Sequence, residues 1–389
     1  MTMKILPSNP FSMKKILLIG LYFFSNFPVF SEANDTLHVQ GQFSAWSTYS
    51  TKSDIKLGLG ARYLPQLDYS LALGNNSKID FEASANLNGS LALIPDDDKY
   101  TSGHIKPYRL WVRYSTEHLE LRTGLQKISF GSATLLRPLM WFDQLDPRDP
   151  LQLTDGVWGM LGRYYFPNNA NLWLWGLEGN KNLKAWETIK TNAHLPEFGG
   201  RFQQPIPKGE LAISYHHRTT NFENTDPSNY TRMPENRIGL DGKWDLGIGI
   251  WFEGTWTNQK IYDSYKRNTE LLNIGTDYTI PLGNGLHLLG EHLFVSIDEN
   301  PFSFDHTYHF SALSAAYPIG IFDNLSGLVF YDWKNRGWYN NLDWKRQYDK
   351  TSFHLILYHN PTNYALPNQA STTNMFAGTG ILLMFVFNH

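Results

Sequence analysis

Cysteine is absent from all 389 residues of this sequence, which excludes disulfide bonds, thiol chemistry and a lipid anchor attached through cysteine. Beyond the first 33 residues, no apolar run approaches the roughly 20 residues that a membrane-spanning helix needs. Neither sign of charge is in large excess, since the formal net charge is −3, so nothing predicts a general attraction to nucleic acid. No glycine-rich phosphate loop follows a predicted strand, and no nucleotide or other cofactor is expected.

The first 33 residues have the pattern of a secretory signal peptide. Lys14 and Lys15 precede an apolar run from Ile16 to Phe30, and the small residues Ser31 and Ala33 follow it at the spacing of a cleavage site. A membrane anchor is the alternative, but polar residues and a proline interrupt the run, which is too short to span a bilayer. We therefore expect residues 1–33 to be removed and residues 34–389 to form one domain.

Most of the remaining chain alternates apolar and polar residues over segments of about ten residues. In one such segment, Ile79, Phe81 and Ala83 share one face, while Asp80 and Glu82 lie on the other. The strands of a soluble β-sandwich also alternate in this way, so the pattern predicts strands but does not show whether their apolar face meets lipid or a protein core. Aromatic residues make up 15% of the chain, which suits the aromatic girdles of outer-membrane barrels.

The connections between these segments favour a membrane barrel, because tight and long links take turns, as they do in outer-membrane barrels. Tight links rich in Pro, Gly, Asn and Asp are expected at 74–77, 115–118, 166–171, 205–209, 244–246, 281–285, 318–324 and 346–349. Longer ones are expected at 94–104, 129–155, 179–197, 219–234, 258–268 and 360–373. The prediction is a closed antiparallel barrel of about 18 strands, or 16 if the weak strand Tyr339–Trp344 is not formed.

The last segment, from Gly380 to Phe387, predicts a strand with large apolar residues at every second position. It resembles the C-terminal strand by which outer-membrane barrels are recognised by their assembly machinery, although Asn388 and His389 follow the phenylalanine. An ordinary buried last strand is the alternative. The resemblance implies a location in the outer membrane of a Gram-negative bacterium, in contact with its lipid.

If the apolar faces meet lipid, the polar faces line the lumen. An Arg side chain that faces lipid at the bilayer midplane costs about 2–4 kcal/mol of stability, whereas in a water-filled lumen it costs about zero. Alternation places six arginines on the lumen face, namely Arg62, Arg109, Arg113, Arg122, Arg163 and Arg201. Such a basic track would favour anions. The alternative is that these arginines brace the wall by pairing with carboxylates on the same face, namely Glu82, Glu120, Glu178 and Glu210.

The longest loop, Ser129–Asp155, has an unusual composition for a surface loop. It carries a strongly apolar stretch from Leu135 to Phe142, which is costly to leave in water, followed by an Asp-Pro-Arg-Asp-Pro run that would stiffen it. We expect the loop to fold into the barrel and narrow it, with constriction residues Trp141, Asp143, Asp146, Arg148 and Asp149. The alternative is a partly ordered external loop.

Two stretches carry a family resemblance, Arg62-Tyr63-Leu64-Pro65 and Leu119–Gln126 running into Gly131 and the acidic loop. They are similar to large porin-type barrels, nearest to the alginate-export and specific-porin groups. The resemblance implies passive passage or export of a hydrophilic solute, either a small or a polymeric acid, without catalysis. No bound metal is expected.

Two other functions are possible for such a barrel. A non-conducting structural or adhesive barrel is the first alternative. An outer-membrane hydrolase is the second, and its candidate histidines are the pairs His216 and His217, His306 and His309, and His354 and His359. None of these pairs lies in a recognisable catalytic or metal-binding motif.

Overall fold

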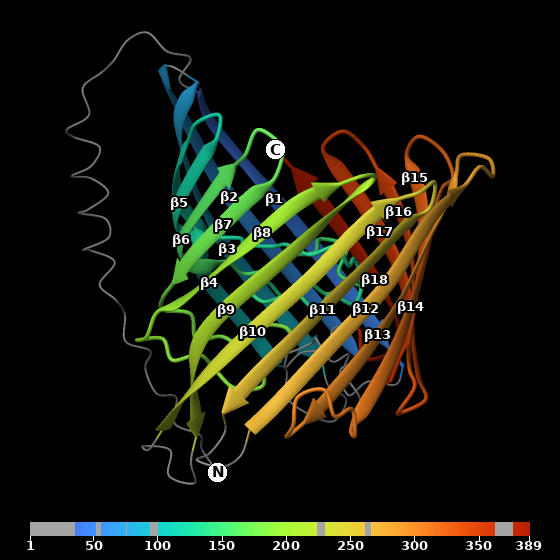
Figure 1. Ribbon diagram of the computed structural model, residues 1–389. Helices are drawn as coiled ribbons and strands as arrows, with labels where there is room; N and C mark the ends of the chain where they lie inside the picture. Colours follow the sequence, from blue (N-terminus) through green and yellow to red (C-terminus); the bar gives the residue numbers. More distant parts are fainter. Residues whose placement is uncertain are drawn as a thin grey trace, which may run out of the picture.

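The chain folds into one closed barrel of 18 antiparallel strands (Figure 1). The computed structural model describes residues 36–51, 56–74, 76–93, 100–223, 230–260, 266–361 and 376–389, so the expected signal peptide lies outside the described residues. Each strand pairs with the next one along the chain, and β18 pairs with β1, which leaves no free edge. The predicted 18-stranded barrel is confirmed, and the weak segment Tyr339–Trp344 lies within β16. Among the described residues, no helix is long and apolar enough to cross a membrane.

The strands have the following bounds. They are β1 (Thr36–Ser50), β2 (Leu57–Gly74), β3 (Ser77–Leu93), β4 (Tyr100–Ser115), β5 (Leu119–Gln126), β6 (Val157–Tyr165), β7 (Asn171–Leu177), β8 (Glu197–Ile206), β9 (Gly209–Glu223), β10 (Tyr230–Asp245), β11 (Gly249–Lys260), β12 (Lys266–Ile280), β13 (Leu286–Asp298), β14 (Thr307–Pro318), β15 (Asp323–Asp332), β16 (Gly337–Gln347), β17 (Thr351–Asn360) and β18 (Gly378–Asn388).

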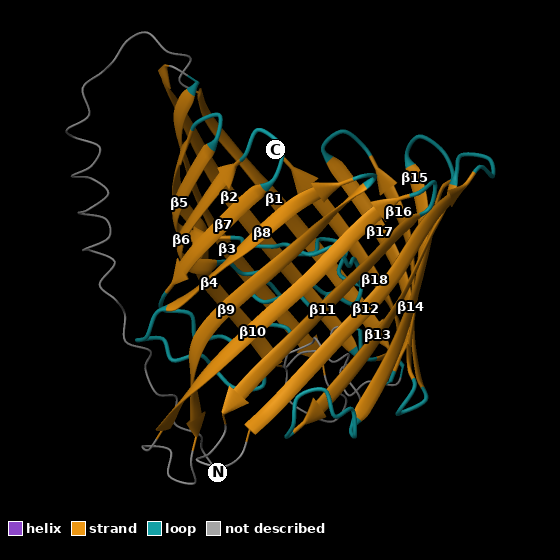
Figure 2. Ribbon diagram, in the orientation of Figure 1, coloured by secondary structure: helices purple, strands orange, loops and turns teal. Residues whose placement is uncertain are grey.

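The eight predicted tight links all fall between the strands expected on either side of them, and they lie together at one end of the barrel (Figure 2). Two of the predicted long links were too long. The strand β4 already begins at Tyr100, and the hairpin of β9 and β10 extends to Glu223 and from Tyr230. The far part of this hairpin is mostly polar, with Thr219, Thr220 and Asn221 on one strand and Thr231 and Arg232 on the other, so its sequence resembles a polar loop rather than a strand.

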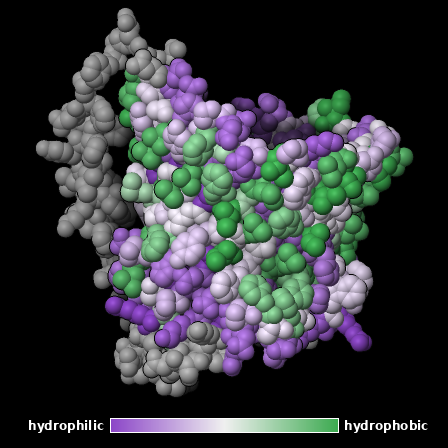
Figure 3. All heavy atoms as spheres, in the orientation of Figure 1, coloured by the Kyte–Doolittle hydropathy of each residue, from purple (hydrophilic) through white to green (hydrophobic). Residues whose placement is uncertain are grey.

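The outer surface of the barrel is apolar over its middle, as a surface in contact with lipid must be. On β12, for example, Leu272 and Ile274 point outward and are 43% and 57% exposed, whereas the intervening Asn273 is fully buried inside. Hydrophobic residues spread over the wall, and hydrophilic ones gather at the lower rim and at the upper edge (Figure 3). Exposed aromatic residues flank this surface at both ends, including Tyr164, Phe166 and Phe202 near the tight turns and Phe302, Trp333 and Trp338 near the long links.

The inside of the barrel is partly filled by chain that turns inward (Figure 2). The strands β5 and β7 have only 8 and 7 residues, so the wall is low there and the segments that follow them enter the lumen. Three apolar clusters form where inward-turning chain meets the wall. One contains Leu271, Leu293 and Phe330, which face inward. The expectation that every inward face is polar is therefore wrong for β12 to β16, where the wall receives apolar residues of a loop.

Candidate functional site

The structure places all six predicted arginines on the inner face of the wall formed by β2 to β8. Their neighbours across the strands show this: Arg113 lies opposite Asp80 on β3 and opposite Arg122 on β5, and all three side chains point into the lumen. The six residues differ in their partners, which separates them into three groups.

Three of the arginines gather near the tight-turn end of the barrel around a single carboxylate. Glu120 lies 2.8 Å from Arg122, 3.6 Å from Arg163 and 4.0 Å from Arg113. Arg113 also donates two hydrogen bonds to Asp80, at 2.9 and 2.7 Å. Three guanidinium groups thus share two carboxylates, so the cluster keeps a positive charge even though each arginine has a partner.

Two further arginines lie farther from the tight turns and have no carboxylate within ion-pair distance among the described residues. Arg109 donates to the backbone carbonyl oxygen of Thr154, at 2.9 Å, and lies 4.0 Å from the ring of Tyr108. Arg62 lies 5.5 Å from the ring of Trp46. Neither contact neutralises a guanidinium, because a carbonyl group and an aromatic ring carry no net charge.

The sixth arginine, Arg201, belongs to a buried ion pair with Asp241 on β10. Of the four glutamates proposed as braces, Glu120 is a partner of the arginines, whereas Glu210 accepts a hydrogen bond from Gln203 instead. Asp80 and Asp241, which were not among the expected partners, supply the other ion pairs.

The segment between β5 and β6, residues 127–156, is here called the constriction loop. Its aromatic residues Trp141 and Phe142 are 3% exposed each and pack with Phe130, Trp175 and His216. The predicted in-folding loop is thereby confirmed. The sequence feature that predicted this in-folding was the apolar stretch, because its side chains leave water by packing against the inner wall.

The second half of the constriction loop crosses to the other side of the lumen. Leu151 packs against the cluster formed by β17 and β18, and the Arg148 guanidinium lies 5.2 Å from the ring of Phe376. Near the end of the loop, Asp155 forms an ion pair with Lys106 on β4, at 2.7 Å. The loop thus contacts opposite walls and narrows the lumen between them.

The acidic residues of the constriction loop mostly pair within the loop. Asp143 lies 3.2 Å from Arg137, and Asp146 accepts two hydrogen bonds from the Arg148 guanidinium, at 3.0 and 2.9 Å. The described partners of these two carboxylates are thus arginines of the loop itself. These ion pairs fix the shape of the loop.

Asp149 differs from the other two aspartates, because the nearby cation is Arg62 on the wall. Burial raises the pKa of the Asp149 carboxyl above its ordinary value. The N–H of Leu151, which donates to Asp149 at 3.0 Å, and the charge of Arg62 oppose this rise only in part. This carboxyl can therefore change its charge at a milder pH than an exposed aspartate does.

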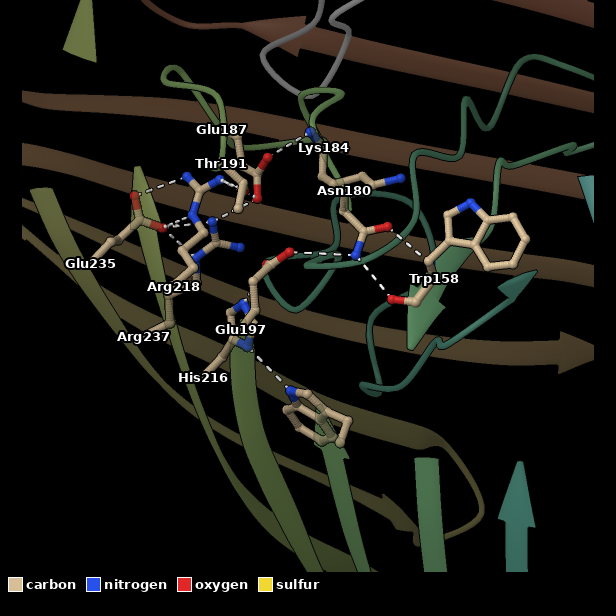
Figure 4. Close-up of polar contacts among 11 residues, drawn as sticks. Trp158, Asn180, Lys184, Glu187, Thr191, Glu197, His216, Arg218, Glu235 and Arg237 are labelled. Carbon is tan, nitrogen blue, oxygen red and sulfur yellow. Dashed lines mark hydrogen bonds and ion pairs between the residues drawn. The ribbon is translucent and has the colours of Figure 1, made fainter. Parts of the chain in front are cut away.

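A second segment, residues 178–196 between β7 and β8, also turns into the barrel (Figure 4). Glu187 of this segment lies 2.9 Å from Arg218 and 2.7 Å from Arg237, and both arginines also pair with Glu235, at 2.6 Å each. All four side chains are nearly fully buried. Sequence analysis did not predict this network, because Glu187 lies in a predicted loop and its partners Arg218 and Arg237 lie on strands far away along the chain.

Further contacts tie this second segment to the wall and to the constriction loop. Asn180 exchanges hydrogen bonds with the backbone of Trp158, and its amide also donates to Glu197 of β8 at 3.5 Å; Glu197 in turn lies 3.3 Å from His216 of β9 (Figure 4). The indole N–H of Trp186 donates to the carbonyl oxygen of Arg137 at 2.8 Å. The two inward-turning segments therefore support each other.

A cavity of about 460 Å³ lies beside these two segments, lined by inward residues of β9 to β15. Trp186 and Tyr308 provide aromatic rings, and Thr255 and Thr269 provide hydroxyl groups. Arg267 is a cation without a carboxylate partner among the described residues. The cavity has room for a small polar molecule.

The histidines considered for catalysis have structural partners where the structure describes them. His216 is buried, with Nδ1 accepting a hydrogen bond from the Trp175 indole and Nε2 beside Glu197. His354 lies 3.0 Å from Asp343, and His306 lies 2.7 Å from Asp298. Across the described part of the chain, no group of three or more His, Cys, Asp or Glu residues is arranged to hold a metal ion.

Comparison with solved structures places this architecture among outer-membrane porins. The barrel is similar to the anion-selective porin from Comamonas acidovorans, with a TM-score of 0.50 and 14% identity over 92% of this chain and 100% of that one. It is also similar to OccAB4 from Acinetobacter baumannii (TM-score 0.54, 11% identity, 92% and 99% covered) and to OccK5 (OpdH) from Pseudomonas aeruginosa (TM-score 0.53, 12% identity, 91% and 97% covered). At these identities the likeness concerns the fold alone.

No protein-family model matches the chain, and no curated protein matches it in sequence. The fold is that of the outer-membrane porins. The resemblance to the alginate-export group stays a prediction.

Proposed function

We propose that this protein is a channel in the outer membrane of a Gram-negative bacterium that lets hydrophilic solutes pass, with a preference for anions. The apolar outer surface, the closed sheet and the porin fold support the membrane location. In this proposal β18 is the strand that the barrel-assembly machinery recognises, and the barrel wall contacts outer-membrane lipid.

The observation that carries the anion preference is the charge of the wall opposite the constriction loop. Arg62 and Arg109 have no carboxylate partner there among the described residues, and Arg113, Arg122 and Arg163 share only two carboxylates. Arginine keeps its charge at any physiological pH, and its planar group of donors fits carboxylate or phosphate. The expected solutes are therefore small acids or acidic polysaccharides. The Comamonas porin, which shares the fold, is anion-selective by its description.

The constriction loop sets the width of the path in this proposal. Trp141 and Asp143 lie in its buried base, whereas Asp146, Arg148 and Asp149 lie in the half that crosses toward Arg62. Solutes would pass between this half and the arginine-bearing wall. Asp149 and Arg62 are then the pair of opposite charges nearest to the passing solute.

Planar-bilayer recording tests the proposal. The purified barrel should give stable current steps, a reversal potential in a salt gradient on the anion side, and block by acidic sugars at concentrations where neutral sugars of the same size have no effect. A reversal potential on the cation side would contradict the anion preference. Failure of every acidic sugar to block would contradict the solute class.

A non-conducting structural or adhesive barrel is the second candidate, and one observation favours it. Two segments, the constriction loop and residues 178–196, occupy the lumen and are joined by the Trp186 hydrogen bond. A lumen closed by both segments would give no current steps in the same recording. An outer-membrane hydrolase has less support, because the described partners of His216 and His354 hold the structure together.

A further inference from the structure

Two glutamates on the inner wall lie beneath the constriction loop. Glu253 on β11 is fully buried, and Glu291 on β13 is 4% exposed. Among the described residues, neither has an Arg, Lys or His within ion-pair distance. A buried carboxylate without a cation is costly unless hydrogen-bond donors surround it.

The donors around both carboxylates are backbone N–H groups of the constriction loop. Ala133 and Leu139 donate to the two oxygens of Glu253, at 2.8 and 2.5 Å. Thr134 donates to Oε1 of Glu291 at 2.7 Å, and Leu135 and Leu136 donate to Oε2 at 3.1 and 2.6 Å. Four successive N–H groups, from 133 to 136, thus point at two wall carboxylates, an arrangement that suits an anion.

Wall residues complete the attachment. The Trp251 indole and the Asn273 amide each donate to Glu291 at 3.2 Å, and the same amide donates to the carbonyl oxygen of Leu136 at 2.9 Å. Gly131, with φ +104°, lies against the Glu253 carboxylate, where a Cβ atom would collide with it. The loop backbone is therefore shaped to reach these two side chains.

We propose that Glu253 and Glu291 are positioning residues that hold the constriction loop against the wall of β11 to β13. In both residues, each carboxylate oxygen already accepts at least one N–H. A glutamine at either position would direct its own N–H₂ group at one of these donors, whichever way the amide is turned. Substitution by glutamine therefore releases part of the loop while it keeps the size of the side chain. The effect on current depends on the proposed channel function, but the attachment itself does not.

Thiol labelling tests the attachment directly. The natural chain contains no cysteine, so Ala133→Cys introduces a single thiol, at a position that is only 6% exposed. In refolded barrels this thiol should react slowly with a water-soluble maleimide. Adding Glu253→Gln and Glu291→Gln should speed the reaction at least tenfold, because the segment leaves the wall more often.

The matched control is Glu270→Gln on β12, which removes an equally buried glutamate whose described hydrogen bond is with the N–H of Phe302. The control should leave the labelling rate unchanged, and circular dichroism should show an intact barrel in every variant. An unchanged labelling rate in the double variant would overturn the proposal, as would equal acceleration by the control.

Bilayer recording of the same variants adds a readout that lost stability alone would not move. The double variant should show at least twofold more open-channel current noise than the natural chain and the Glu270→Gln control. Accelerated labelling with no current in any variant would uphold the attachment and contradict the channel. Steady current with unchanged noise and unchanged labelling would uphold the channel and overturn the attachment.

Discussion

Arg201 on β8 and Asp241 on β10 form a two-pronged ion pair across β9, with Nη1 to Oδ1 at 2.5 Å and Nη2 to Oδ2 at 2.9 Å. Both side chains are nearly fully buried. Ser132 of the constriction loop also donates to Asp241, at 3.2 Å. The charge of Arg201 is therefore neutralised within the wall, in contrast to that of Arg62 or Arg109.

Replacing Arg201 with Ala should lower the stability of the barrel. Removal of one partner leaves the Asp241 charge buried alone, which costs about 3–5 kcal/mol of unfolding free energy. Urea unfolding of the barrel in lipid vesicles measures this loss. The double variant Arg201→Ala with Asp241→Ala should recover part of it, since no unpaired charge is left. Equal losses of unfolding free energy in the single and the double variant would contradict the role assigned to the unpaired Asp241 charge.

Replacing Arg109, Arg113 and Arg122 together with Ala should move the reversal potential in a salt gradient toward cations. The three substitutions remove three positive charges from the wall and leave Asp80 and Glu120 with fewer partners, so the lumen becomes more negative. The matched control is Arg201→Ala with Asp241→Ala, because it removes an arginine together with the carboxylate that neutralises it and so leaves the net charge of the wall unchanged. An unchanged reversal potential in the triple variant, with current intact, would refute the selectivity claim.

Mild acid should strengthen the anion preference through Asp149. Burial raises the pKa of this carboxyl, so it gains a proton at a pH above the ordinary range of an aspartate. Arg62, Asp146 and the backbone N–H groups of Leu151 and Leu153 are the charged and polar groups that act on it. Protonation removes a negative charge beside Arg62, and the lumen becomes more positive as the pH falls.

The measurement for Asp149 is the reversal potential as a function of pH. In the natural chain it should move toward anions as the pH falls through the raised pKa. The Asp149→Asn variant should already show at neutral pH the reversal potential that the natural chain reaches in acid. Its reversal potential should no longer change as the pH falls through the raised pKa of Asp149. A pH profile that Asp149→Asn leaves unaltered would assign the change to other groups.

Alternation in the sequence was enough to predict most strands, because residues such as Leu272 and Asn273 have clearly different surroundings. It failed at the far part of the hairpin of β9 and β10, where polar residues such as Thr219, Thr220 and Asn221 resemble a loop. The in-folding loop was predictable because its apolar stretch had to leave water. Its attachment was not, because the partners of Glu253 and Glu291 are backbone N–H groups 114 to 157 residues away. Backbone groups carry no signature in a sequence.

Deleting Leu135 to Leu145 should raise single-channel conductance. These residues include the apolar stretch that packs against the inner wall, with the buried Trp141 and Phe142. Their removal should therefore widen the lumen. The part of the loop that remains after the deletion still contacts the wall, because Asp155 pairs with Lys106 and the carbonyl of Thr154 accepts from Arg109. The arginine-bearing wall therefore stays in place. The comparison variant is Glu253→Gln with Glu291→Gln, which releases the loop but keeps all of its residues. If mean conductance rises in the deletion and not in this variant, the rise is due to the space that the deleted residues occupied. Equal or lower conductance after the deletion, in a barrel that still folds, would mean that solutes do not pass beside this loop.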